Sequence, residues 1–150
     1  DQGIREAERA AELLADVEIS AICASPLQRA QHTAEIIATR HGLQIKTIDE
    51  FRERNWGELE GGAFPSSLGT PQPPGGEALD EYVARIEKAL TRFLHLTPNG
   101  CGLLVAHAGG FDALCRIFGI EDGTPVIGNA QPIRFDPPEI PNAPWRISSI

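Results

Sequence analysis

The sequence predicts an α/β fold, a three-layer α/β/α sandwich in which helices cover both faces of a largely parallel sheet. Strand-like apolar runs alternate along the chain with helical patterns, which is typical of this class. Residues 103–106 form a continuous apolar run, which indicates a strand covered on both faces. The 150 residues, 41% of them apolar, suffice for one core, and no linker or internal repeat divides them. We therefore expect residues 1–150 to form a single domain.

Four elements are predicted in the first third of the chain. Residues 4–15 carry alanine and leucine at helical spacing and indicate an amphipathic helix, and residues 21–24 indicate a short buried strand. A second helix over residues 26–41 is expected to end at Gly42, a typical C-cap residue. Residues 44–48 alternate in character and predict a second strand.

A long irregular stretch is expected to follow. Residues 51–62 are polar and contain glycine, and residues 64–76 carry four prolines and three glycines, which excludes regular structure. The longest helix is predicted over 77–96, where an apolar stripe at helical spacing places Tyr82 in the core, and Asn99 and Gly100 end it. A strand over 103–106, a helix over 109–118, and strands over 132–135 and 145–148 joined by a proline-rich loop are expected to follow.

Composition excludes several classes of function. The formal net charge of −8 argues against broad nucleic-acid binding and against anchoring on an anionic membrane. No apolar run approaches a membrane span, and no signal peptide is recognised. The three cysteines, Cys23, Cys101 and Cys115, show neither metal-ligand spacing nor a disulfide framework. These features predict a reducing, cytoplasmic compartment.

Arg29 is the first candidate for a functional residue. Ser25 suits a helix N-cap, Pro26 suits the first helical position, and Gln28 suits a capping box. Arg29 would then lie in the first turn of a helix, where a guanidinium and unsatisfied backbone N–H groups together bind phosphate. The alternative is an arginine on an exposed helix face without a chemical role.

His107 and the loop after residue 50 are the next candidates. His107 follows the strand over 103–106 and precedes two glycines and a helix, so it is expected at the carboxyl edge of the sheet, where ligands bind. There it can stabilise an anionic oxygen, although a histidine satisfied within a turn is the alternative. Glu53 belongs to the polar loop over 51–62. If this loop lies near a bound phosphate, a carboxyl group in it could protonate the oxygen that leaves the phosphorus. A solvated acidic loop is the alternative.

Together these features resemble the histidine phosphatase superfamily, which includes cofactor-dependent phosphoglycerate mutases, fructose-2,6-bisphosphatases and broad-specificity phosphatases. The resemblance covers nearly the whole chain and rests on four stretches in the family's order: SPLQRAQHTA (25–34), FRERNWGELEG (51–61), PGGEALDEYVARI (74–86) and LLVAHAGG (103–110).

The resemblance implies a role for each candidate residue. Arg29 would be a phosphate-binding arginine, Glu53 the proton donor to the leaving group, and His107 a phosphate-binding histidine that stabilises the transition state. The ligand would be phosphate or a phosphorylated small molecule, with no metal and no diffusible cofactor. The short proline-rich segment at 64–76 would leave the pocket open.

The sequence also departs from the family pattern. The family's nucleophile is a histidine in an Arg-His-Gly motif at the end of a first strand, and no such strand is present. The triplet Arg40-His41-Gly42 does not qualify, because it follows a helix and Gly42 is the expected C-cap. We expect a phosphoglycerate mutase-like fold with the first strand missing. An edge or gap in the sheet would result, which a homodimer could fill.

Three functional readings remain open at this point. The chain could be a phosphatase or mutase-like enzyme that acts on phosphate monoesters through a phosphohistidine when complete, and is inactive as written. It could instead be a natural shortened relative that binds phosphorylated ligands without catalysis, or an assembly module that keeps only the scaffold. Hydrolysis is favoured over mutase activity among the enzymatic readings.

Overall fold

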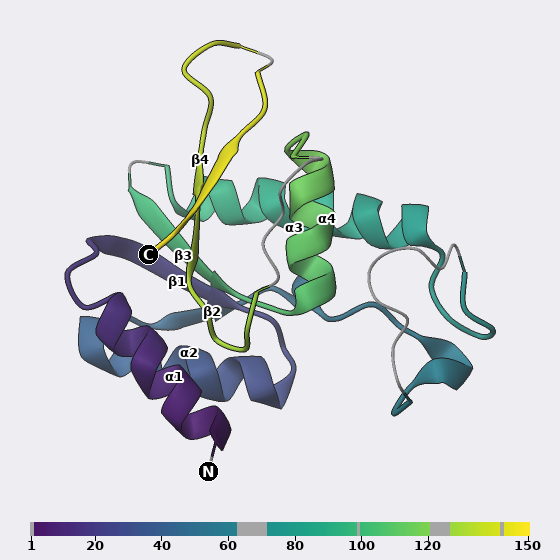
Figure 1. The fold of residues 1–150 in the computed structure, drawn as a ribbon, viewed down its shortest axis with the longest axis horizontal. Helices are drawn as coiled ribbons and strands as arrows, with labels where there is room; N and C mark the ends of the chain where they lie inside the picture. Colours follow the sequence, from purple (N-terminus) through teal and green to yellow (C-terminus); the bar gives the residue numbers. More distant parts are fainter. Residues whose placement is uncertain (1, 63–71, 99, 121–126, 142) are drawn as a thin grey trace.

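A computed structural model describes residues 2–62, 72–98, 100–120, 127–141 and 143–150. Four helices and five strands alternate along these residues (Figure 1). Two short 3₁₀ turns, η1 (Asp49–Phe51) and η2 (Gly57–Leu59), follow the second strand. The main elements are α1 (Gln2–Leu13), β1 (Ile19–Ala24), α2 (Gln28–His41), β2 (Ile45–Thr47), α3 (Leu79–Leu96), β3 (Cys101–Val105), α4 (Ala108–Ile117), β4 (Ile133–Asp136) and β5 (Arg146–Ser149).

The predicted three-layer α/β/α architecture is confirmed. Helices α1 and α2 lie on one face of the central sheet, and α3 and α4 lie on the other (Figure 1). The alternation of side chains along β1 serves both layers. Ile22 and Ala24 pack toward α1 and α2, whereas Cys23 packs toward α3 and α4. Alanines at 10, 11, 34 and 38 are buried in this layer, where α1 and α2 lie close to each other.

The sheet has the order β2-β1-β3, and both pairings are parallel. Ile22 lies opposite Ile45 on one side and opposite Leu103 on the other. Among the described strands there is no gap between β1 and β3, and the expected open edge lies at β3, which pairs with β1 alone. β3 differs from the prediction of a strand covered on both faces. Its residues from Gly102 to Val105 are only half-buried, since no described strand pairs with its other edge.

Two helix starts differ from the sequence prediction. The residue before α2 is Leu27, with extended backbone and no side-chain cap, so the prediction of Ser25 as N-cap and Gln28 as capping-box partner is wrong. Helix α3 begins two residues later than predicted, because Glu77 contacts the preceding loop. The predicted cap at Gly42 is confirmed, with φ of 65° and its N–H donating to the Ala38 carbonyl.

The carboxyl-terminal strands form a separate antiparallel hairpin, β4–β5, which extends beyond the rest of the domain (Figure 1). Aromatic contacts attach it to α4. Phe135 packs against Phe111 and Phe118, and the Trp145 ring stacks on Phe118 with 4.1 Å between centroids. Residues 63–71, which include most of the predicted proline-rich segment, and Asn99 lie outside the described residues. No helix within the described ranges is long and apolar enough to cross a membrane.

Candidate active site

Strands β1 and β3 end side by side, and this brings Ser25 and His107 together. Ala24 is paired with Val105, and the Ser25 N–H donates to the Val105 carbonyl at 2.9 Å. His107 is the residue before α4, in extended conformation, and its Nε2 lies 2.7 Å from the Ser25 hydroxyl oxygen. Ser25 is fully buried, so it fixes the imidazole at the carboxyl edge of the sheet, as the sequence predicts.

His107 is electrostatically tuned to its surroundings. Burial lowers its pKa to about 4, and the positive charge of Arg29 contributes in the same direction. The imidazole is therefore neutral at pH 7 in the free protein. An anion placed between His107 and Arg29 would reverse this balance, because it would favour a proton on the imidazole.

Arg29 is the second residue of α2 and lies in its first turn, as predicted. Its side chain is exposed, and it lines a shallow depression of about 460 Å³ together with Gln28, Gln31, His32 and Glu35. Gln31 ties the helix to the sheet edge, because its Nε2 donates to the Ser25 carbonyl at 2.6 Å. The start of α2 and His107 thus lie at the same edge of the sheet, and the charge of Arg29 acts on the imidazole.

Glu53 follows β2 and η1, and its carboxyl group points to the start of α4. Oε1 accepts hydrogen bonds from the Arg54 backbone N–H at 2.8 Å and from the Tyr82 hydroxyl at 3.3 Å. A Cβ atom at Gly109 would come within 2.5 Å of the same Oε1. The carboxyl group can therefore reach the first turn of α4, two residues from His107, because residue 109 is a glycine.

Sequence reasoning missed three members of this site. Ser25 was assigned to helix capping, Tyr82 to the core, and Asp112 to no role. Asp112 lies one turn after Gly109 on the same face of α4. Burial raises the pKa of Asp112, and the negative charge of Glu53 raises it further. The spacing of three residues between 109 and 112 is the one sequence signal that could have placed Asp112 beside Glu53.

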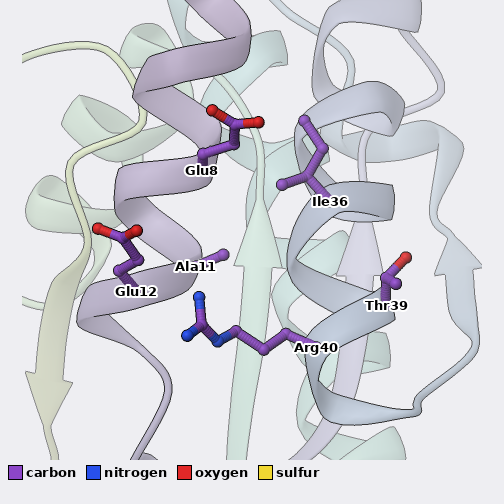
Figure 2. Close-up of a pocket in the computed structure, with 6 residues that line it drawn as sticks. All are labelled: Glu8, Ala11, Glu12, Ile36, Thr39 and Arg40. Carbon is purple, nitrogen blue, oxygen red and sulfur yellow. The ribbon is translucent and has the colours of Figure 1, made fainter.

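The Arg40-His41-Gly42 triplet lies far from this site. Arg40 is eleven positions after Arg29 on the same helix, which corresponds to about 16 Å along its axis. Figure 2 shows Arg40 reaching from α2 toward α1, where it lines a second shallow depression with Glu8 and Glu12. The exclusion of this triplet as a catalytic motif is consistent with that position. His32 and His95 are exposed on helices, as expected.

A family model described as the histidine phosphatase superfamily (branch 1) matches residues 1–126. The chain belongs to the histidine phosphatase superfamily. The relative named "Uncharacterized phosphatase PhoE" of Bacillus subtilis (strain 168) is 32% identical over 152 residues, which cover 97% of this chain and 77% of that protein. The chain spans about half or less of several other curated relatives, between 27% and 55% of their length.

Solved structures agree with this membership of the superfamily. The alpha-ribazole phosphatase from Shigella flexneri is 25% identical, with a TM-score of 0.68 over 81% of this chain and 67% of that one. The YhfR protein of Bacillus stearothermophilus has a TM-score of 0.83 over 99% of this chain and 82% of that one. At 20% identity, the second comparison shows the fold alone. Within the described ranges of this superfamily member, no cluster of three or more potential metal ligands occurs.

Proposed function

We propose that this chain carries the phosphate-binding and proton-donating parts of a site that hydrolyses phosphate monoesters. The observation that carries the proposal is the convergence of Arg29, His107 and Glu53 at the carboxyl ends of parallel strands. Arg29 and the N–H groups at the start of α2 bind the phosphoryl oxygens. His107 donates a hydrogen bond to one of these oxygens and stabilises the charge that develops on them.

Glu53 is proposed as the general acid. As a nucleophile bonds to phosphorus and the bond between phosphorus and the leaving oxygen breaks, that oxygen takes the proton of the Glu53 carboxyl group and leaves as an alcohol. Glu53 remains as a carboxylate and must regain a proton before the next turnover. Its place against the first turn of α4, two residues from His107, favours this role because the leaving oxygen adjoins the bound phosphoryl group.

Complete hydrolysis through a phosphohistidine also needs a nucleophilic histidine. The four histidines of this sequence are His107, the two exposed residues His32 and His95, and His41 at the far end of α2. We propose that residues 1–150 on their own bind phosphate and hydrolyse phosphate monoesters negligibly. A clear turnover of p-nitrophenyl phosphate by these residues, lost in His107→Ala, would contradict this part.

Phosphate binding is tested by thermal unfolding of residues 1–150 with added inorganic phosphate or vanadate. We expect the midpoint to rise with ligand concentration, since a ligand at 100 times its Kd stabilises the folded state by about 2.7 kcal/mol. Arg29→Ala should abolish the rise. Arg40→Ala is the matched control, because it removes the same charge from the opposite end of α2. If millimolar phosphate has no effect, or if Arg29→Ala and Arg40→Ala respond alike, the site does not bind phosphate.

Two further expectations stay predictions. The homodimer was inferred from an edge or gap in the sheet, and the edge of β3 that no described strand covers is where a second copy would pair. Light scattering that shows a monomer would end the dimer hypothesis. The cytoplasmic location was predicted from sequence features, chiefly cysteine usage, and fractionation of the source cells would test it.

A further inference from the structure

The side chain of Arg85 on α3 reaches the loop that carries Glu53. Its Nη1 donates to two backbone carbonyls just before Glu53, that of Glu50 at 2.6 Å and that of Arg52 at 2.9 Å. Two charge-assisted hydrogen bonds from one nitrogen hold this backbone against α3. Arg85 therefore does more than form an ion pair with a carboxylate, because it also contacts the backbone of the loop before Glu53.

Glu77 fixes the other side of the same loop. The Arg85 guanidinium binds the Glu77 carboxylate in a bidentate manner. Its Nε donates to Oε1 at 2.8 Å, and its Nη2 donates to Oε2 at 2.6 Å. Glu77 in turn accepts the Asn55 N–H on Oε2, and its carbonyl accepts two hydrogen bonds from the Arg54 side chain. Burial alone would raise the pKa of Glu77, but the hydrogen bond and charge of Arg85 hold it below its usual value.

Tyr82 connects Arg85 directly to the Glu53 carboxyl group. The guanidinium carbon of Arg85 lies 4.9 Å from the centre of the Tyr82 ring, which suits a cation–π contact. Tyr82 is fully buried, and its hydroxyl donates to Glu53 Oε1. Within the described residues, both recorded hydrogen bonds to the Glu53 carboxyl group end on Oε1. Oε2 is therefore the oxygen that would carry the proton in the proposed acid role of Glu53.

A structural role is the simpler alternative for this network. A half-buried ion pair is weak evidence of stabilisation, because desolvation offsets much of the attraction between the charges. Here, however, the donors of Arg85 are divided between the Glu77 carboxylate and the two carbonyls before Glu53. The Arg85 guanidinium thus fixes the backbone of the loop before Glu53. Through its contact with the Tyr82 ring, it also fixes the orientation of the Glu53 carboxyl group.

We infer that Arg85 is a positioning residue for Glu53, which it holds through the loop carbonyls and Tyr82 so that Oε2 faces the leaving group. The inference takes the acid role of Glu53 from the proposed function. Lysine cannot replace Arg85, because a single ammonium group does not span the Glu77 carboxylate and both carbonyls.

The single tyrosine of the chain provides a direct readout. Biosynthetic incorporation of 3,5-difluorotyrosine labels position 82 alone, and the electron-withdrawing fluorines lower the pKa of its phenol. The charged groups around this phenol are Glu53 on the loop, Glu77 just before α3 and Arg85 on α3. Asp112 on α4 interacts electrostatically with Glu53. Burial and the Glu53 charge both raise the pKa of Tyr82, so its titration reports whether the carboxylate is in place.

The experiment is a double-mutant cycle on the labelled protein. In the otherwise unchanged chain, Glu53→Gln should lower the titration midpoint of residue 82 by about 1 pH unit. In an Arg85→Lys background, the same change should have less than about a third of that effect, because the carboxylate is no longer held against the phenol. Arg40→Lys is the control, since Arg40 is exposed at the far end of α2, away from the Glu53 loop. It should leave the full effect of Glu53→Gln.

A full effect of Glu53→Gln in the Arg85→Lys background would overturn the inference. Circular dichroism checks that each variant folds. If Arg85→Lys does not fold, Glu77→Gln takes its place, because it weakens the bidentate contact and keeps the size of the side chain. An undiminished effect in that background would equally refute the positioning role. This assay contains no phosphate, so its result does not depend on phosphate binding at Arg29. The positioning role of Arg85 can therefore be refuted while phosphate binding is confirmed, and phosphate binding can be refuted while the positioning role is confirmed.

Discussion

Acidification should destabilise the free protein through His107. Its pKa is lowered to about 4 by burial and by Arg29, whereas in the unfolded chain it titrates near 6.5. Between these values the unfolded chain binds a proton that the folded protein does not bind. Stability therefore increases with pH across this window, and the contribution of His107 is fully present above pH 6.5 and lost as the pH falls toward 4.

The size of the effect follows from the same values. A pKa of about 4 against 6.5 corresponds to about 3.4 kcal/mol if water does not screen the charge. The His107 side chain is only half-buried, so screening reduces the expected loss to about 1–2 kcal/mol. In a domain of this size, such a loss lowers the thermal midpoint by about 2–8 °C.

Urea unfolding at pH values from 7.5 to 4.5, followed by tryptophan fluorescence, measures this loss. Carboxylates titrate in every variant, so the difference between wild type and His107→Gln isolates the histidine. We expect the wild type to lose about 1–2 kcal/mol more than His107→Gln between pH 7 and 4.5. His95→Gln is the control, because His95 is exposed on α3, and it should follow the wild type. Equal pH dependence in wild type and His107→Gln would refute the reasoning.

Two further predictions concern packing around α4. Gly109→Ala should lower the free energy of unfolding by about 1–3 kcal/mol, because the new Cβ would lie 2.5 Å from Glu53 Oε1. Gly110→Ala should leave the stability unchanged or raise it, because no atom would lie nearer than 3.8 Å to its Cβ. Denaturant unfolding measures both, and equal effects would contradict the contact. Trp145→Ala should cost about 2–3 kcal/mol by removing the stacked aromatic pair, while Ile140→Ala, on the same hairpin and 70% exposed, should change stability by less than about 0.5 kcal/mol. A Trp145→Ala variant as stable as Ile140→Ala would show that the stack contributes nothing.

The sequence placed Arg29 and His107 correctly because both depend on local features. A strand followed by a helix brings its connecting residues to the carboxyl edge of a sheet, whatever the rest of the chain does. Ser25 was assigned wrongly because its hydroxyl has two competing partners, the start of α2 and an imidazole 82 positions away. Capping patterns describe only the first of these, and the distant partner cannot be seen in a local pattern.

The environment of Glu53 was only partly predictable for a similar reason. Helical spacing identified Tyr82 as a core residue, and it is fully buried. Its hydroxyl, however, meets Glu53 only because an irregular loop lies against α3 and because Gly109 leaves room beside it. The conformation of the loop depends on contacts such as those of Arg85 with backbone carbonyls. The spacing of apolar residues along the sequence does not predict such contacts. The partial exposure of β3 was missed because strand order is also a nonlocal property.

The pairing of β1 with β3 has a consequence for the order of folding. Residues 2–47 contain α1, β1, α2 and β2, whose contacts span short distances along the chain and can form early. Joining β3 to β1 closes a loop of about 80 residues, at an entropic cost of about 4 kcal/mol beyond a constant. The His107–Ser25 contact forms only with that step. A phosphate ion bound there would therefore stabilise only those states in which β3 has already joined β1.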